Sequence, residues 1–388
     1  MINNNYQALP SHLDKINLIN KGAFYTSPIY VDTVWDFIEP YIDKETVVFD
    51  PACGYGVFLS KETKAKKIGN DIDSKALEIA KNNTKDVAYY NYNFLEVFNR
   101  TAYGIDEEKK LIVIGNPPYN DITSQAKKRL KKLNFGVNEK LKTRDIGISF
   151  LRAFDYLKAD YICVLHPLSY LIKKANFNLL KNFRENYIIV DSLIISSKYF
   201  NQTSKSSEFP IVIALYKRKE NNGMDYEYIK NFNFKTIEGK TFKLSDFEYI
   251  GDFINKYPKK NIKIKEGDIL FYTLRDINAL KRNKTFIEKP IANAVKVDID
   301  KLDYYIYVDI FKDFIRHVPY YFGNLDILID TQLFRRYKDY FISYALKKYP
   351  FLKKHYSNSK IHPKDETFIL KYFKELLKGH FIPIKEKK

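Results

Sequence analysis

The sequence predicts an α/β protein with a doubly wound, mostly parallel seven-stranded sheet, followed by a smaller α+β domain. Three observations support this prediction. Over residues 1–220, short apolar runs alternate with longer amphipathic stretches, as in folds built from strand–helix–strand units. A glycine turn directly follows the first β-rich run. Beyond residue 220 the chain becomes more basic and the expected elements are mixed.

The first element expected is a helix that begins after Pro28 and ends near Pro40. Its apolar residues recur at helical spacing: Val31, Val34, Trp35 and Ile38. Ser74 is expected to cap a second helix, and further helices are expected over 148–157 and 168–183. Strands are expected at 46–50, 67–71, 87–92, 111–115, 161–165, 187–195 and 211–217.

A polar linker over 217–223 predicts a domain boundary at residue 220. Residues 1–220 hold 32 basic and 25 acidic residues, whereas residues 221–388 hold 33 and 22. The smaller second domain is therefore the more basic one. Within it, a strand is expected at 304–308 and a helix at 368–377.

Composition narrows the function classes. The 388 residues include 65 Lys and Arg against 47 Asp and Glu, which gives a net charge of +18. This charge favours nucleic acid as the partner, although a generally basic proteome would give the same balance. Two cysteines are too few for a disulfide framework or a zinc site, so we expect a reducing, cytoplasmic setting and no metal. No signal peptide or membrane span is expected. The aromatic content of 16% suits either core packing or base stacking.

The glycine turn runs from Asp50 to Gly56 and predicts a nucleotide-type pocket. Gly54 and Gly56 allow a sharp turn and close approach of a ligand, and a helix is expected to open at Val57. The third glycine of the dinucleotide fingerprint is absent, which weakens an NAD interpretation. About 20 residues later, Asp71 stands where a ribose needs an acceptor, whereas helix capping is the preferred role of Asp73.

A second motif, Asn116-Pro117-Pro118-Tyr119, ends an apolar strand. Two prolines fix the backbone and remove two N–H donors, so the loop presents oxygen acceptors. The Asn116 side-chain oxygen and the Pro117 carbonyl suit the two hydrogens of an exocyclic amine, and Tyr119 offers a ring on which a base can stack. A plain turn is the alternative interpretation.

Together these motifs, preceded by Gly22-Ala23-Phe24-Tyr25-Thr26-Ser27-Pro28, resemble the gamma class of S-adenosylmethionine-dependent DNA adenine-N6 methyltransferases. The resemblance covers about residues 20–220. It implies a Rossmann-like catalytic domain over 1–220 and a DNA target-recognition domain over 221–388. It also implies methyl transfer from S-adenosylmethionine to N6 of an adenine flipped out of duplex DNA. The implied setting is bacterial modification or restriction–modification, with a separate restriction endonuclease as a candidate partner.

The resemblance also implies roles for individual residues. The cofactor would be held by Phe24, Tyr25, Thr26, Asp50, Pro51, Ala52, Cys53, Gly54, Asp71, Ile72, Asn93, Phe94 and Asn116. The family more often has Asp where this chain has Asn93, and Ser27 interrupts the usual Tyr-Thr-Pro order. The flipped base would lie between Tyr119 and a second ring, for which Phe200 is the candidate and Phe209 the reserve, although either ring could instead pack in the core.

Three alternatives remain open: a cytosine-N4 methyltransferase, a protein glutamine methyltransferase, and a catalytically idle DNA-binding specificity subunit. Cytosine carbon-5 methylation is excluded because it needs a Pro-Cys nucleophile, whereas Cys53 and Cys163 fit small core positions. His166 could line the pocket, but a hydrogen-bonded loop histidine is the preferred interpretation.

DNA phosphates are expected to contact Lys127, Lys128, Arg129, Lys131 and Lys132, with a solvated helix face as the alternative. In the second domain, the candidates for base or backbone contacts are Arg275, Arg282, Arg316, Arg335 and Arg336.

Overall fold

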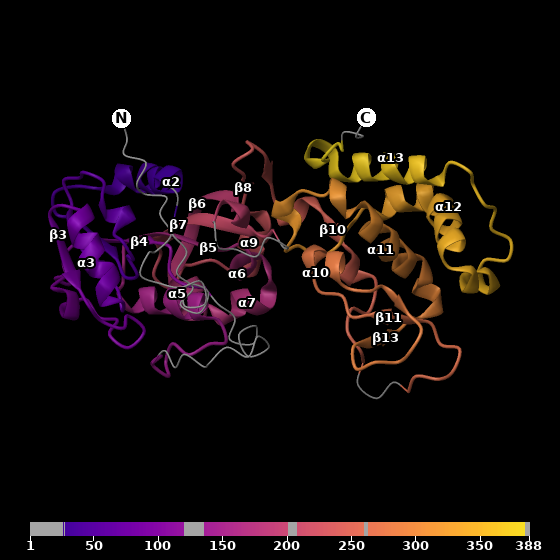
Figure 1. Ribbon diagram of the computed structural model, residues 1–388, viewed down its shortest axis with the longest axis horizontal. Coiled ribbons are helices and arrows are strands. Elements are labelled where there is room, and N and C mark those ends of the chain that lie inside the picture. The colour runs from indigo at the N-terminus through magenta and orange to yellow at the C-terminus, as the bar shows by residue number, and fades with distance from the viewer. Residues whose placement is uncertain (1–25, 27, 120–135, 201–207, 260–262, 385–388) are drawn as a thin grey trace. The chain divides into compact units, whose positions relative to one another are not determined.

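The computed structural model describes residues 26, 28–119, 136–200, 208–259 and 263–384. The chain divides into two compact units, Met1–Phe242 and Lys243–Lys388, here called unit 1 and unit 2 (Figure 1). In the described part of the chain, no helix combines the length and the apolar character needed to cross a bilayer.

Unit 1 contains a seven-stranded sheet with the order β3-β2-β1-β4-β5-β7-β6. Its strands are β1 (Val47–Asp50), β2 (Lys66–Asn70), β3 (Val87–Tyr90), β4 (Leu111–Gly115), β5 (Tyr161–Pro167), β6 (Tyr187–Ser196) and β7 (Pro210–Arg218). Neighbouring strands run parallel except at β7, which is antiparallel to both β5 and β6. The predicted mostly parallel, doubly wound sheet is therefore confirmed.

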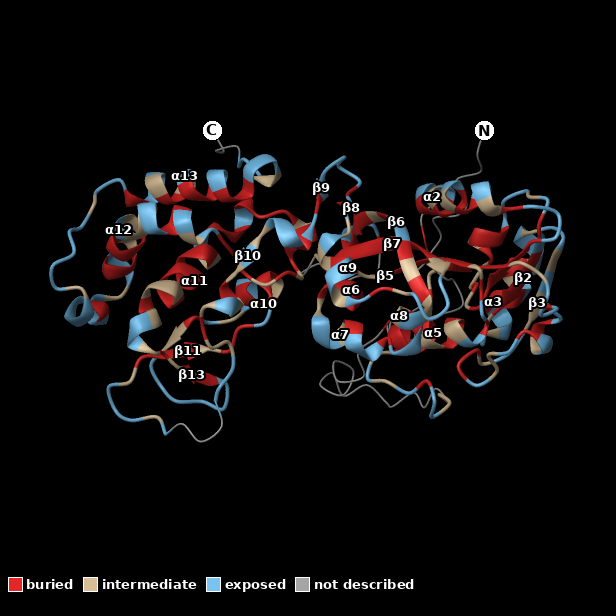
Figure 2. Ribbon diagram, turned by 180° about the vertical axis from the view of Figure 1, so that it is seen from behind, coloured by how far each residue is buried: buried red, intermediate tan, exposed pale blue. Residues whose placement is uncertain are grey.

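Helices cover both faces of this sheet. In Figures 1 and 2, α2 (Pro28–Ile38) lies on one side of the strands and α5 (Ile146–Tyr156) on the other. The other helices among the described residues of unit 1 are α3 (Ser74–Asn83), α6 (Ser169–Ile172), α7 (Lys174–Leu179), α8 (Asn182–Asn186) and α9 (Tyr226–Asn231). Because both faces are covered, the central strands β1 and β4 are buried along their whole length, which explains why their sequences are apolar except for Asp50 at the end of β1.

Local differences from the predicted elements have simple causes. Only one 3-10 turn, Val57–Leu59, follows the glycine turn, because the chain must reverse before β2 begins at Lys66. The helix expected over 168–183 is broken into α6, α7 and the start of α8, with extended backbone at Lys173 and a positive φ at Lys181. Asp73, not Ser74, is the N-cap of α3, since its side chain accepts a hydrogen bond from the Lys75 amide at 3.1 Å.

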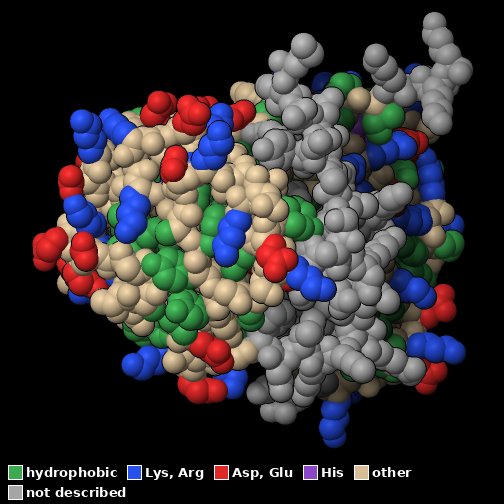
Figure 3. Space-filling view, turned by 60° about the vertical axis from the view of Figure 1, so that its left-hand side comes forward, with side chains coloured by type: hydrophobic (Ala, Val, Ile, Leu, Met, Phe, Trp, Pro, Cys, Tyr) green, Lys and Arg blue, Asp and Glu red, His purple; other side chains and the backbone are tan. Residues whose placement is uncertain are grey.

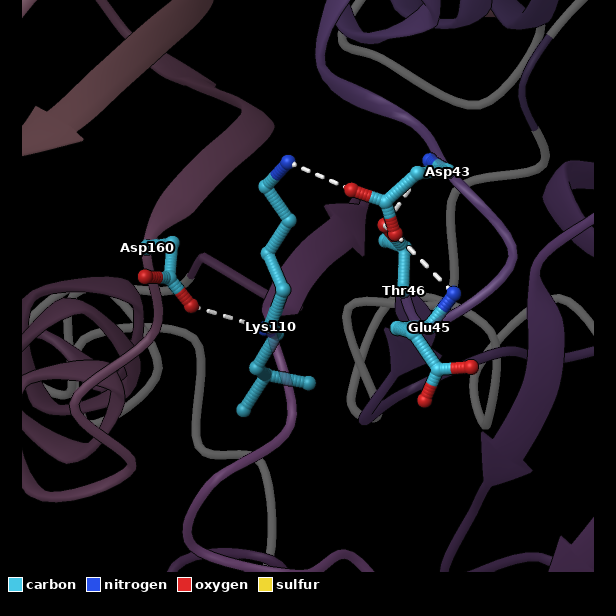
Figure 4. Close-up of polar contacts among 6 residues, drawn as sticks. Asp43, Glu45, Thr46, Lys110 and Asp160 are labelled. Carbon is cyan, nitrogen blue, oxygen red and sulfur yellow. Dashed lines mark hydrogen bonds and ion pairs between the residues drawn. The ribbon is translucent and has the colours of Figure 1, made fainter.

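The amino ends of β1 and β4 are held together by a polar network (Figure 4). Lys110 donates to Asp43 at 3.0 Å, and Asp43 also accepts a hydrogen bond from the Thr46 hydroxyl at 2.8 Å. The hydrogen bond from Lys110, supported by the one from Thr46, lowers the pKa of Asp43 to about 2. Asp160 accepts from the Leu111 amide at 2.8 Å. This edge of the sheet stabilises the fold and lies opposite to the carboxyl ends where the predicted site residues lie.

The unit boundary differs from the predicted one, because residues 221–242 belong to unit 1 rather than to the second domain. The predicted linker is hydrogen-bonded to α8: the amides of Gly223 and Met224 donate to the carbonyls of Glu185 and Arg184 at 2.8 and 2.7 Å. The short strands β8 (Phe234–Lys235) and β9 (Thr241–Phe242) follow, with Phe234 buried. A polar sequence therefore forms a hydrogen-bonded turn here instead of a flexible linker.

Unit 2 is built around the buried helix α11 (Leu302–Phe314), shown in red in Figure 2. Around it lie the helices α10 (Ile277–Arg282), α12 (Thr331–Lys348) and α13 (Asp365–Leu377), and two small sheets. One sheet has the order β12 (Phe286–Ile287), β11 (Leu270–Tyr272), β13 (Ala294–Lys296). The other pairs β10 (Glu248–Tyr249) with β14 (Leu328–Ile329). The prediction of a strand at 304–308 is wrong, because these residues lie within α11. The helix expected at 368–377 is confirmed as part of α13.

Tyrosine and phenylalanine rings form much of the unit 2 core. The Tyr307 ring lies within 5.1–6.4 Å, between centroids, of the rings of Phe334, Phe341, Tyr372 and Phe373. The Tyr307 hydroxyl donates to the Leu328 carbonyl at 2.6 Å, so the buried polar end of the ring is satisfied. Core packing therefore accounts for a large share of the aromatic residues in the composition.

Candidate functional site

The glycine turn connects the carboxyl end of β1 to its neighbours. Asp50 is buried, and its Oδ1 accepts a hydrogen bond from the Ala52 amide at 3.1 Å. The Cys53 amide donates to the carbonyl of Asn70 at 2.8 Å, which fixes the turn against the end of β2. Burial raises the pKa of Asp50 well above its usual range, and the neighbouring charge of Asp71 raises it further.

Gly115, at the end of β4, allows the Asp50 side chain to lie at the centre of the sheet. A Cβ atom on Gly115 would lie 2.6 Å from Oδ1 of Asp50, and Gly115 has a φ of +135°. Both observations require glycine at this position. The carboxylate of Asp50 thus lies at the carboxyl ends of two adjacent central strands, β1 and β4.

Asp71 follows β2 and holds the glycine turn with its side chain. Its Oδ2 accepts a hydrogen bond from the Gly54 amide at 2.8 Å, and its Oδ1 accepts from the Asp73 amide at 2.9 Å. The neighbouring residue Ile72 is 50% exposed. A carboxylate beside an exposed apolar side chain is a surface that suits a nucleoside.

Asn70 is a positioning residue that the sequence did not reveal. It is fully buried, and its Nδ2 donates to the carbonyls of Pro51 and Tyr92 at 3.0 and 3.1 Å. Its Oδ1 accepts from the Tyr92 amide at 3.0 Å. One side chain therefore connects the loops that follow β1 and β3. Asn70 is a polar residue at the end of a buried strand, and that position was the only signal in the sequence.

The loop after β3 carries Asn93 and Phe94. Oδ1 of Asn93 accepts from the Leu95 amide at 3.1 Å, and its Nδ2 donates to the Gly136 carbonyl at 2.7 Å. An aspartate could not make the second hydrogen bond, which gives a reason for Asn at this position. Phe94 is buried and stacks on Phe150 of α5 with a centroid distance of 5.6 Å. Phe150 is a second residue that the sequence analysis did not single out.

The Asn-Pro-Pro-Tyr motif directly follows β4. Nδ2 of Asn116 donates to Oγ1 of Thr26 at 3.2 Å, which brings together two residues 90 positions apart in the chain. Only 7% of Tyr119 is exposed, and burial raises the pKa of its hydroxyl. The neighbouring Asn116 side chain acts on the Tyr119 hydroxyl in the opposite direction and lowers its pKa. Because β4 pairs with β1, the motif that follows β4 lies beside the glycine turn that follows β1.

Phe200, the candidate for the second stacking ring, is 2% exposed and stacks on Tyr30 of α2 with centroids 6.1 Å apart. Its ring therefore packs in the core of the structure as it stands, and its contact with a base stays a prediction. Phe209 is partly buried.

His166 lies on β5 rather than on a loop. Its Nε2 hydrogen-bonds the Tyr216 hydroxyl at 2.7 Å, and burial lowers its pKa to about 4.

Several predicted residues lie outside the described residues. These are Phe24 and Tyr25, and the basic cluster Lys127, Lys128, Arg129, Lys131 and Lys132. In unit 2, all five candidate arginines are exposed: Arg275, Arg282, Arg316, Arg335 and Arg336. On the face of unit 1 visible in Figure 3, basic and acidic side chains are interspersed.

Comparison with known proteins supports the interpretation of unit 1. Residues 41–205 match the Eco57I restriction-modification methylase family. The ribosomal RNA small subunit methyltransferase A of Metamycoplasma arthritidis is 31% identical over 173 residues, which cover 42% of this chain and 61% of that protein. The chain thus matches about three fifths of the length of that curated relative.

The solved structures found in the comparison include a protein from Listeria monocytogenes assigned to the class I S-adenosylmethionine-dependent methyltransferases. It is 14% identical with a TM-score of 0.39, over 56% of this chain and 66% of that chain. A modification subunit assigned to a type I restriction enzyme from Vibrio vulnificus is 14% identical with a TM-score of 0.38, over 56% of this chain and 47% of that chain.

The described residues fit S-adenosylmethionine. Oδ2 of Asp50 is buried and accepts no hydrogen bond from the described part of the chain, so it suits an N–H donor or cation on a ligand. Asp71 and the exposed side chain of Ile72 suit the ribose and the purine of a nucleoside. The family match and this site together support a methyltransferase of the restriction-modification type with S-adenosylmethionine as its cofactor.

Proposed function

We propose that the protein is a site-specific DNA methyltransferase that modifies N6 of adenine in duplex DNA. The observation that carries this proposal is the Asn116–Tyr119 motif at the end of β4, beside Asp50 and the glycine turn. The motif presents oxygen acceptors without competing N–H groups, which is what an exocyclic amine requires. A hydroxyl or carbon acceptor would need a base or a nucleophile instead.

The residues of the motif would act by alignment and by accepting hydrogen bonds. An adenine amine is a weak nucleophile because its lone pair is delocalised into the ring. When the Asn116 and Pro117 oxygens accept both amine hydrogens, electron density is restored to the nitrogen. The Thr26 hydroxyl holds the Asn116 amide at 3.2 Å, so the side chain does not have to be ordered when the base arrives. The bound cofactor supplies an electrophilic methyl group.

The adenine must leave the duplex to reach this loop, at a cost of a few kcal/mol. Stacking on Tyr119, and on a second ring such as Phe200, would offset part of that cost. Phosphate contacts from the basic cluster at 127–132 and from the exposed arginines of unit 2 would hold the duplex. We assign target recognition to residues 243–388, in place of the range 221–388 expected from the sequence.

A further set of exposed lysines in unit 2 suits the phosphate backbone. Residues 350–364, between α12 and α13, hold four lysines and two histidines and no acidic residue. On α12 itself, Lys338, Lys347 and Lys348 are paired with Asp303, Asp365 and Asp309. The lysines of the segment have no such ion pair within the described residues, so their charge is available to a polyanion: Lys353, Lys354, Lys360 and Lys364.

The test is methyl transfer from labelled S-adenosylmethionine to genomic duplex DNA, followed by nucleoside analysis. Label in N6-methyladenine is expected. Label only in N4-methylcytosine would overturn the assignment of the acceptor. Asn116→Ala should abolish transfer with little change in cofactor affinity, whereas the exposed Asn231→Ala on α9 should leave transfer unchanged.

A structured RNA is the second candidate acceptor, because the 31% identical relative is named a ribosomal RNA methyltransferase. Small-subunit ribosomal RNA belongs in the same assay as a competing substrate. Preferential labelling of the RNA would replace DNA by RNA in the proposal.

A further inference from the structure

Helix α5 makes an unusually close approach to the Asn-Pro-Pro-Tyr motif at Gly147. Asp145 is the N-cap of α5, and its Oδ1 accepts a hydrogen bond from the Gly147 amide at 2.9 Å. A Cβ atom at position 147 would lie 2.9 Å from Cβ of Tyr119 and 2.5 Å from the hydroxyl of Tyr170. Both distances are shorter than any that real Cβ atoms tolerate. Only glycine therefore fits between the two tyrosines.

Tyr119 cannot easily move away from a side chain at position 147. Its Cβ is attached directly to the backbone, so rotation about χ1 leaves that atom in place. The backbone itself is restricted, because Pro117 and Pro118 precede Tyr119 and fix two φ angles. Relief of the contact would need a shift of the loop that carries Asn116, or a shift of α5.

Tyr170 supports the same contact from its other side. Its hydroxyl donates to Oδ1 of Asp145, the carboxylate that caps α5. Its ring is fully buried and stacks on His166, with centroids 5.4 Å apart and an interplanar angle of 12°. The start of α5 is thus fixed between a capped, stacked tyrosine and the tyrosine of the motif.

We propose that Gly147 is a positioning residue for Tyr119. The missing side chain lets α5 press against the Cα–Cβ bond of Tyr119 and sets where that ring lies beside Asn116. In this proposal Gly147 acts through Tyr119 and needs no contact of its own with the acceptor or the cofactor. This inference rests on the proposed function only in its kinetic test, which measures methyl transfer.

The first test is Gly147→Ala, assayed for transfer and for binding of S-adenosylmethionine in the absence of any acceptor. We expect kcat to fall by about tenfold or more, because a shift of the Tyr119 ring would misplace the base that stacks on it, and misplacement of a reacting group by a fraction of an ångström is costly. The cofactor dissociation constant should stay within about twofold of the wild-type value. The matched control is Gly379→Ala, where an added Cβ would have nothing within 4 Å, and it should change neither quantity. An unchanged kcat, or equal losses of kcat and cofactor affinity, would overturn the proposal.

A second variant separates the two tyrosines. Gly147→Ala combined with Tyr170→Phe removes the hydroxyl that lies 2.5 Å from the new Cβ, the shortest of its contacts, and leaves Cβ of Tyr119 at 2.9 Å and the ring atom Cε2 of residue 170 at 3.0 Å. Measured against Tyr170→Phe alone, the double variant should keep most of the loss in kcat. Full recovery of kcat would show that the new side chain acts through its contact with Tyr170 and not with Tyr119, and would refute the proposal.

A crystal structure of Gly147→Ala gives a readout that does not depend on activity. We expect Cβ of Tyr119 to be displaced away from the new methyl group. If Tyr119 keeps its place while α5 moves, Gly147 does not position the ring. Should the wild-type protein methylate cytosine or RNA, the proposed function fails, but the same kcat comparison with that acceptor still tests Gly147.

Discussion

Replacement of Asn70 by alanine should weaken both the fold of unit 1 and its affinity for S-adenosylmethionine. The side chain makes three hydrogen bonds of 3.0–3.1 Å, all to backbone groups of the loops after β1 and β3. At about 1 kcal/mol net for each bond, Asn70→Ala costs roughly 3 kcal/mol of the free energy of unfolding. For a unit of this size, that corresponds to a fall in Tm of roughly 6–12 °C.

Part of the same free energy holds the two loops in place for the cofactor. If about half of it serves that purpose, the dissociation constant of S-adenosylmethionine rises about tenfold, since 1.4 kcal/mol corresponds to a factor of ten. Isothermal titration calorimetry without DNA measures that constant, and differential scanning calorimetry measures Tm.

The matched control is Asn186→Ala. The Asn186 amide also makes two hydrogen bonds, to Asp155 at 2.8 Å and from the Asn221 amide at 3.2 Å, but it lies at the amino edge of β6. Its loss should lower Tm with cofactor affinity kept within about twofold of the wild-type value. Wild-type affinity in Asn70→Ala, or an equal loss of affinity in both variants, would refute the role given to Asn70.

Three further predictions concern buried charge, pH and salt. Asp50→Asn should raise Tm at pH 7 and weaken cofactor binding by roughly tenfold. Because the pKa of Asp50 is raised in the folded state, the gain in Tm should vanish as the pH falls below about 4. A gain that persists below about pH 4 would show that the buried charge of Asp50 does not cause it. His166 has a folded pKa of about 4, below its unfolded value, so its neutral form stabilises the fold at pH 7 and that contribution is lost on acidification. Between pH 7 and 4 the free energy of unfolding of the wild-type protein should fall by about 3 kcal/mol more than that of His166→Gln. His355→Gln, at an exposed position, is the control. Equal falls in the three proteins would show that His166 does not titrate in this way. The four lysines of segment 350–364 are Lys353, Lys354, Lys360 and Lys364, and their replacement by glutamine should make the plot of log affinity for DNA against log salt less steep by about 3–4. An unchanged slope would exclude phosphate contact by these lysines.

The sequence predicted the sheet of unit 1 well because each strand has a local signal. Leu111–Gly115 is entirely apolar, and such runs mark strands that are covered on both faces. The same reasoning failed at Tyr304–Val308. These β-branched and aromatic residues belong to α11, which is buried on almost every side and therefore shows no amphipathic period. Tertiary burial overrode the local propensity there.

In the site, the motif residues could be found from the sequence because glycine and proline have backbone roles that are visible locally. Asn70, Phe150 and Gly147 could not be found in this way. Their importance lies in contacts with residues 19–56 positions away along the chain, such as Pro51 for Asn70 and Phe94 for Phe150. Single-sequence patterns carry no information about such pairs until the strand order brings them together.

The antiparallel strand β7 has a practical consequence for cutting the chain into fragments. At its last residue, Arg218, the amide donates to the Asp160 carbonyl at the amino edge of the sheet. Within the next 24 residues, the Tyr228 hydroxyl donates to the Ile189 carbonyl of the outer strand β6, and Thr236 pairs with Ile194. A recombinant fragment that stopped at residue 220 would lose the buried Ile229 and Phe234 and leave β6 open to pairing with other molecules. A fragment that ends at Phe242 keeps that strand covered and is the better choice for expression of the catalytic part alone.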